Sequence, residues 1–152
     1  MRWKSIVGIL LVAALLSGCV KQQATDLPGT AFIANLKTSL SIGEVAIIGT
    51  VAALPAFKLD AEDQANAVGV LKDIGTTRDS LASRLAKYDH FDSKNAEEIK
   101  QAARDAIDTL RELHDKRVDH IKNAQARQRI DVAFNVVQSL AEMILGAQPV
   151  TP

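Results

Sequence analysis

The chain has 152 residues, with 18 basic and 18 acidic side chains and a formal net charge of +0. This balance excludes the strongly positive surface by which proteins bind nucleic acids or anionic lipids. A single cysteine excludes an intramolecular disulfide, so a domain of this length must be stabilised by packing alone.

The first 18 residues have the three parts of a secretory signal peptide. Residues 1–4 are short and basic, residues 5–16 are almost wholly apolar, and Ser17 and Gly18 are small. A membrane-spanning helix is one alternative, but spanning takes about 20 apolar residues. The first helix of a globular core is another, and it leaves the small residues before Cys19 unexplained. The signal peptide is the favoured interpretation.

The sequence Leu16-Ser17-Gly18-Cys19 resembles the lipobox of bacterial lipoproteins. The resemblance implies cleavage between Gly18 and Cys19, a thioether-linked diacylglycerol on Cys19, and an amide-linked fatty acyl chain such as palmitate. Each buried methylene contributes about 0.8 kcal/mol, so these chains together would hold the protein at the membrane. No other cofactor and no metal is expected.

Residues 19–28 have no apolar period and are predicted to be a lipidated tether. The nine residues after Cys19 reach about 30 Å at most, which keeps the folded domain close to the lipid. Val20 stands where lipoproteins retained in the inner membrane often have Asp. In a Gram-negative source, the resemblance therefore implies the outer membrane, with the domain facing the periplasm. Removal of Arg2 and Lys4 leaves 16 basic and 18 acidic residues.

Residues 29–147 are predicted to form one helical bundle domain, and its first helix changes character along its length. Phe32, Leu36 and Leu40 repeat every four residues, which predicts one buried helical face. From Ile42 to Pro55 the sequence is apolar nearly all round, which is typical of a buried helix.

Small residues form a stripe on this apolar segment, at Gly43, Ala46, Thr50 and Ala53. Small side chains allow another helix to approach closely. Two interpretations stay open. The stripe either packs inside the bundle, or it is a face for self-association or membrane contact.

Two helices of about 28 residues follow, near residues 60–88 and 93–121, joined by a short polar break. Asp60 is a good N-cap for the first of them. So short a break predicts an antiparallel hairpin. With the turn centred near Phe91, Arg78 is expected to pair with Asp105 or Asp108. The alternative for Arg78 is an aliphatic stem that is buried while its charge reaches water.

Residues 122–129 contain no large apolar side chain, so one helix either ends there or passes through a stutter. Ile130, Phe134, Val137 and Ile144 then define a last helical face, which ends at Gly146. Residues 148–152 are predicted to be a flexible tail. The sequence thus predicts an all-α antiparallel bundle of about four helices around a long central hairpin, without a sheet.

No catalytic pattern is present in the sequence. His90, His114 and His120 lack the spacing of metal ligands. There is no nucleophile motif and no glycine-rich phosphate loop. The protein is therefore predicted not to be an enzyme.

The leading functional hypothesis is a membrane-anchored envelope lipoprotein that acts as a helical interaction or assembly module. Its partner would be another envelope protein or a second copy, with no role for nucleic acid. By analogy of size and helical content, secretin pilotins and phage-encoded exclusion lipoproteins are alternatives. A further alternative is a membrane-active protein that inserts residues 42–57 into lipid.

Overall fold

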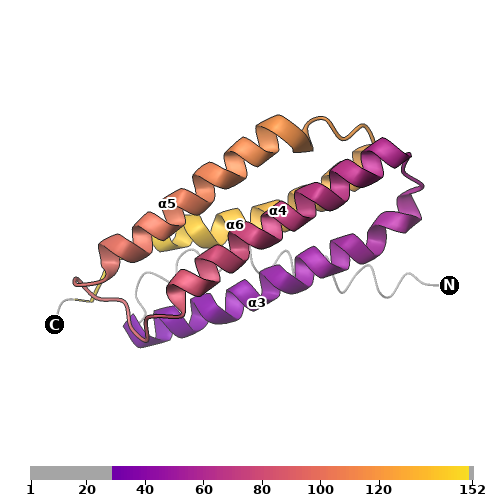
Figure 1. The fold of residues 1–152 in the computed structure, drawn as a ribbon. Helices are drawn as coiled ribbons and strands as arrows, with labels where there is room; N and C mark the ends of the chain where they lie inside the picture. Colours follow the sequence, from indigo (N-terminus) through magenta and orange to yellow (C-terminus); the bar gives the residue numbers. More distant parts are fainter. Residues whose placement is uncertain (1–28, 151–152) are drawn as a thin grey trace.

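The computed structural model describes residues 29–150, which form four long antiparallel helices (Figure 1). These are α3 (Gly29–Ala53), α4 (Ala61–Leu85), α5 (Ala96–Leu113) and α6 (Ala124–Gly146). Short helical segments extend α3 and α5, namely η2 (Leu54–Phe57) and η3 (His114–Val118). Within residues 29–150 there is no strand, only one isolated bridge between Asp92 and Val150. The predicted all-α helical bundle is confirmed.

Two of the helices lie on opposite sides of the bundle. Helix α3 packs on α4 and α6, and α5 packs on the same two helices from the other side (Figure 1). Each of these outer helices therefore has one face in the core and one face turned away from it. This arrangement allows the two outer faces to be compared directly.

The apolar period places the core as the sequence predicts. In α3, Phe32, Leu36 and Leu40 are each at most 3% exposed. The predicted faces of the other helices are buried too, at Leu71, Ile74, Leu81, Leu85, Ile99, Leu110, Ile130, Val137 and Ile144. Where the apolar residues repeat regularly along a helix, the repeat thus identifies its inward side.

The loop of the central hairpin is longer than predicted. Helix α4 ends at Leu85 instead of near Tyr88, and α5 begins only at Ala96. The Asp92 carboxylate accepts hydrogen bonds from the backbone N–H of Lys94 at 2.9 Å and of Asn95 at 3.1 Å. These bonds hold a local turn and delay the start of the helix, because Asp side chains compete for backbone donors.

A loop separates the helix that contains α5 from α6. Of the two alternatives for residues 122–129, a helix end and a stutter, the structure therefore has the helix end. Helix α5 continues as the π-helical η3, and α6 begins at Ala124. The Asn123 side chain caps α6 by accepting from the N–H of Gln125 at 3.1 Å and of Ala126 at 3.0 Å. The missing apolar stripe therefore marks a loop and a new first turn.

A buried carboxylate from α4 holds this connection. Asp63 is 4% exposed and accepts from the backbone N–H of Lys122 at 3.1 Å and of Asn123 at 2.9 Å. Asp63 lies in the first turn of α4, where an acidic residue is favourable on local grounds alone. Its partners lie about 60 residues away in the chain, and no local pattern indicates them.

The start of α3 meets the hairpin loop and the end of the described chain. The backbone N–H of Phe91 donates to the Gly29 carbonyl at 3.2 Å, and that of Val150 donates to the Phe91 carbonyl at 3.3 Å. A Cβ on Gly29 would lie 2.5 Å from the Phe91 carbonyl oxygen, so only glycine fits without a shift. The first residue after the predicted tether is thus firmly packed.

Candidate interaction surface

The second half of α3 and the turn after it expose a side without charge. Val45, Ile48 and Val51 are 69%, 60% and 43% exposed. Smaller exposed residues lie among them, at Gly49, Ala52, Pro55 and Ala56. No charged residue occurs between Glu44 and Lys58. We call these seven exposed residues the α3 outer face.

Helix α6, which packs against α3, also exposes a large apolar residue. Val132 of α6 is 41% exposed and lies one turn before Val136. A Cβ built on Gly43 would lie 3.6 Å from the Val136 side chain, so this stripe of α6 borders α3. Isolated apolar side chains are common on surfaces, whereas the largest apolar patch of a protein is often functional.

The stripe of small residues lies on the other side of α3. Gly43 and Thr50 are buried, and Ala46 and Ala53 are half-buried. A Cβ on Gly43 would meet Val136 and Val137 of α6 and the Arg78 stem of α4, at 3.6–3.9 Å. The stripe thus packs within the bundle. Of the two interpretations left open for these four residues, their burial favours packing inside the bundle, where the absence of a side chain at Gly43 lets α4 and α6 approach α3.

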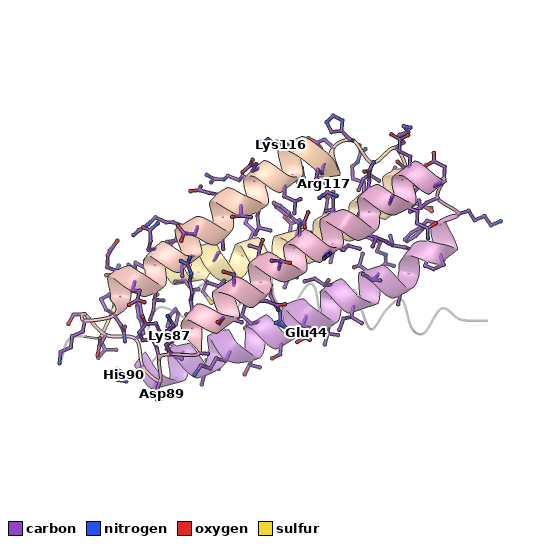
Figure 2. All side chains as sticks on the ribbon, viewed as in Figure 1. Glu44, Lys87, Asp89, His90, Lys116 and Arg117 are labelled. Atoms are coloured by element: carbon purple, nitrogen blue, oxygen red, sulfur yellow. The ribbon has the colours of Figure 1, made fainter. Side chains whose placement is uncertain are left out.

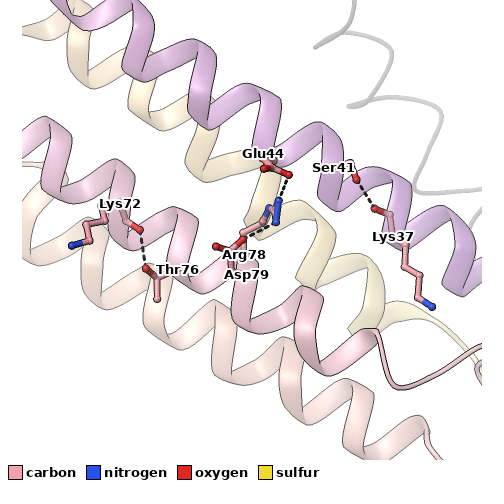
Figure 3. A network of polar contacts seen from close by, with 7 residues as sticks. All are labelled: Lys37, Ser41, Glu44, Lys72, Thr76, Arg78 and Asp79. Carbon is pink, nitrogen blue, oxygen red and sulfur yellow. Dashed lines mark hydrogen bonds and ion pairs between the residues drawn. The ribbon is translucent and has the colours of Figure 1, made fainter.

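Arg78 joins two helices at the inner edge of α3, as Figure 3 shows. Its side chain is 11% exposed, and its guanidinium donates to Glu44 of α3 and, at 2.6 Å, to the neighbouring Asp79. The predicted pairing with Asp105 or Asp108 is not formed. Asp105 pairs instead with Arg84, at 2.6 Å.

The longer hairpin loop explains this correction. The pair of Arg84 with Asp105 places the midpoint of the hairpin between Lys94 and Asn95, beyond the predicted centre at Phe91. A second pair, between Asp73 and Arg117, agrees with this register (Arg117 is labelled in Figure 2). Facing positions are therefore shifted along α5, away from Asp105 and Asp108.

The outer face of α5 has the opposite character. Its exposed residues are polar or charged, namely Glu97, Glu98, Gln101, Asp108, Thr109, Arg111 and Glu112. A hydrogen bond from Gln101, and then the Arg84 guanidinium, hold the pKa of Asp105 below its usual value. A hydrogen bond from Lys116, at 2.5 Å, lowers the pKa of Glu112 in the same way (Lys116 is labelled in Figure 2). These carboxylates stay ionised, so this face is suited to water.

Two of the three histidines lie near acidic side chains. In His114, Nε2 lies 3.4 Å from Asp131 Oδ1, Nδ1 lies 3.9 Å from Asp119 Oδ2, and the ring packs edge-on against Phe134. His90 Nε2 lies 3.0 Å from Asp92 Oδ2. Over residues 29–150, no group of three or more His, Cys, Asp or Glu side chains could hold a metal ion.

One continuous helical stretch of the described chain, Gly29–Phe57, is long and apolar enough to cross a membrane. Only 22% of its most apolar 18-residue window is buried in the bundle. Length and composition alone are weak evidence, since core helices share them.

The predicted lipidation and cleavage residues, Cys19 and Gly18, lie outside the described residues. Comparison with protein-family models, curated proteins and solved structures finds no match for this chain.

Proposed function

We propose that this protein is an envelope lipoprotein, anchored through Cys19, whose helical bundle is a non-enzymatic interaction or assembly module. The location expected for it is the periplasmic side of the outer membrane. The observation that carries the proposal is the unequal exterior of the bundle. The α3 outer face has no charge, whereas the exposed residues of α5 are charged or polar.

An uncharged exterior is costly where it faces water. Exposed apolar area forgoes about 25 cal/mol per Å² that contact with an apolar surface would recover. The α3 outer face combines three large aliphatic residues on successive turns of one helix. A module that works by contact accounts for this face, and the ordered bundle beneath it needs no rearrangement to present it.

The anchor is tested on the native product. We expect the intact mass of the membrane-extracted protein to fit a chain that begins at Cys19 and carries three acyl chains. Metabolic incorporation of an alkyne-labelled fatty acid should occur in the wild type and be lost in Cys19→Ser. An intact Met1 start with a free thiol would contradict the proposal. Cross-linking in intact cells, followed by mass spectrometry, then identifies any protein partner.

A second candidate is a membrane-active protein that inserts residues 42–57, and the length of the apolar stretch Gly29–Phe57 favours it. Insertion would require α3 to leave the bundle, which would expose the buried Gly43, Ile47 and Thr50 and break the Arg78–Glu44 pair. Release of a trapped dye from vesicles by the full-length protein would support this candidate. Intact vesicles would leave the lipid-anchored module as the better account.

A further inference from the structure

We propose that the α3 outer face rests on the surface of the bilayer that holds the anchor, so that the bundle lies along the membrane. In this orientation α5 points away from the lipid into the aqueous compartment. The inference depends on the lipid anchor at Cys19 proposed above, and it names what the uncharged face contacts.

The position of the anchor brings α3 to the membrane before any other helix. Only nine residues separate Cys19 from Gly29, a reach of about 30 Å. Gly29 is packed against Phe91 and begins α3 directly. The outer face begins at Val45, about 24 Å further along the same helix. Anchor and outer face are therefore at opposite ends of one helix, and a bundle lying flat engages both.

The chemistry of the face fits an interfacial contact. An interfacial helix buries its apolar side about 5–10 Å into the boundary between headgroups and acyl chains. Along α3 and η2, no charge would enter this zone between Glu44 and Lys58. Glu44 is paired with Arg78, and Lys58 is exposed at the other end, where its ammonium can meet lipid phosphates.

No unfolding is needed for this contact. Val45, Ile48 and Val51 already face outward, while Gly43 and Thr50 on the inner side remain packed against the bundle. The charged face of α5 lies on the opposite side, across α4 and α6 (Figure 1). The part of the bundle that contains residues 45–56 is thus amphipathic in the direction from α5 to α3.

A second copy of the chain is a weaker occupant for this face. A stable protein interface buries about 800 Å² on each partner. Three large side chains and four small ones make a patch on the order of a few hundred Å². An anchored bundle is held beside a bilayer at all times, and a modest apolar patch is enough to orient a protein that is already tethered.

The experiment uses the lack of any second cysteine. If Cys19 is lipidated, a cysteine introduced by Ile48→Cys is the sole free thiol of the full-length protein. Asp108→Cys, at an exposed position of α5, is the matched control. Each variant is purified with its lipid anchor, labelled with an environment-sensitive fluorophore, and reconstituted into phosphatidylethanolamine and phosphatidylglycerol vesicles with or without spin-labelled lipids.

We expect the fluorophore at position 48 to shift to shorter wavelength and to lose most of its emission when spin-labelled lipids are present. The fluorophore at position 108 should do neither. Equal, weak quenching at both positions would overturn the inference, since the bundle would then stand away from the lipid. Disulfide dimers of the unlabelled Ile48→Cys protein, together with no quenching of the labelled protein, would overturn it in favour of a second copy.

Failure of the anchor itself gives a different result. Wild-type protein should not react with the thiol-specific fluorophore, because the sulfur of its only cysteine would be held in the thioether to diacylglycerol. Labelling of the wild type would contradict the proposed lipoprotein. Unreactive wild type together with an unquenched position 48 contradicts only the orientation of the bundle.

Discussion

Helices α3 and α5 occupy equivalent places in the bundle, yet their outer faces differ. Both pack on α4 and α6, and both bury a regular apolar stripe. The exposed residues of α5 are charged or polar, whereas those of α3 between Glu44 and Ala53 are apolar or glycine. Because α5 shows that this position can be filled with charged residues, folding alone does not explain the apolar exterior of α3. The contact with lipid that we propose would account for it.

Truncation of the inner side of α3 should have the largest effect on stability. Leu36 is 1% exposed, so Leu36→Ala should lower the free energy of unfolding by about 2–5 kcal/mol through lost burial and a residual cavity. Ile48→Ala, on the outer side, should change it by less than about 0.5 kcal/mol. Urea denaturation of the full-length protein in detergent measures both. Similar losses from the two variants would mean that the outer face is part of the core.

The two glycines on opposite sides of α3 should respond differently to a large side chain. A Cβ on Gly43 already contacts Val136 and Val137, so Gly43→Leu should cost about 1–3 kcal/mol by overpacking. No atom lies within 4 Å of a Cβ on Gly49, so Gly49→Leu should not destabilise the bundle. Thermal unfolding followed by circular dichroism distinguishes them. A stable Gly43→Leu variant would contradict the inward placement of the stripe.

Replacing glycine by alanine in α3 should change the stability of the protein in opposite directions at Gly49 and at Gly29. Gly49→Ala should stabilise the protein by about 0.5–1 kcal/mol, because alanine has the higher helix propensity and meets no neighbour. Gly29→Ala should destabilise it, because the new Cβ would clash with the Phe91 carbonyl. The midpoint of urea denaturation checks the pair. Stabilisation by both would refute the close contact at Gly29.

The smallest effect is expected on α5. The lowered pKa of Asp105 means that its stabilising contribution is present above the pKa of an unfolded Asp, about 4, and is lost as the pH falls through the lower folded value. In the Asp105→Asn variant, the melting temperature should therefore fall slightly less between pH 6 and pH 2 than it does in the wild type. Melting temperatures between pH 2 and 6 measure this loss, and an unchanged profile would show that Asp105 does not contribute.

The sequence predicted the helices and their buried sides better than it predicted their partners. Asp60 was identified as an N-cap, and its carboxylate accepts from the Asp63 N–H at 2.7 Å. Capping is local, so residues three apart are enough to recognise it. The partner of Arg78 depended instead on the length of a loop. The predicted centre of the hairpin turn was wrong by a few residues, and this error shifted the predicted partner of every residue along the hairpin.

Which side of α3 faces outward could likewise be identified only from the packing of the helices. A segment that is apolar nearly all round has no periodicity to show which side faces out. The sequence left two interpretations of the small stripe open, one inside the bundle and one on its outer surface. Only the neighbouring helices decide this, because α4 and α6 can approach closely where α3 has Gly43 and Thr50.

The amino-acid sequence by itself determined the features that depend on residues close together in the chain. These are the helical periodicity, the helix caps, the helix breaks, and the lipobox-like residues that predict an anchor. What required the tertiary structure is which surfaces remain uncovered and which distant charges meet, such as Asp63 with the backbone of Lys122 and Asn123. The reason is physical. Periodicity is a property of one helix, whereas exposure and ion pairing depend on the register and distance between helices.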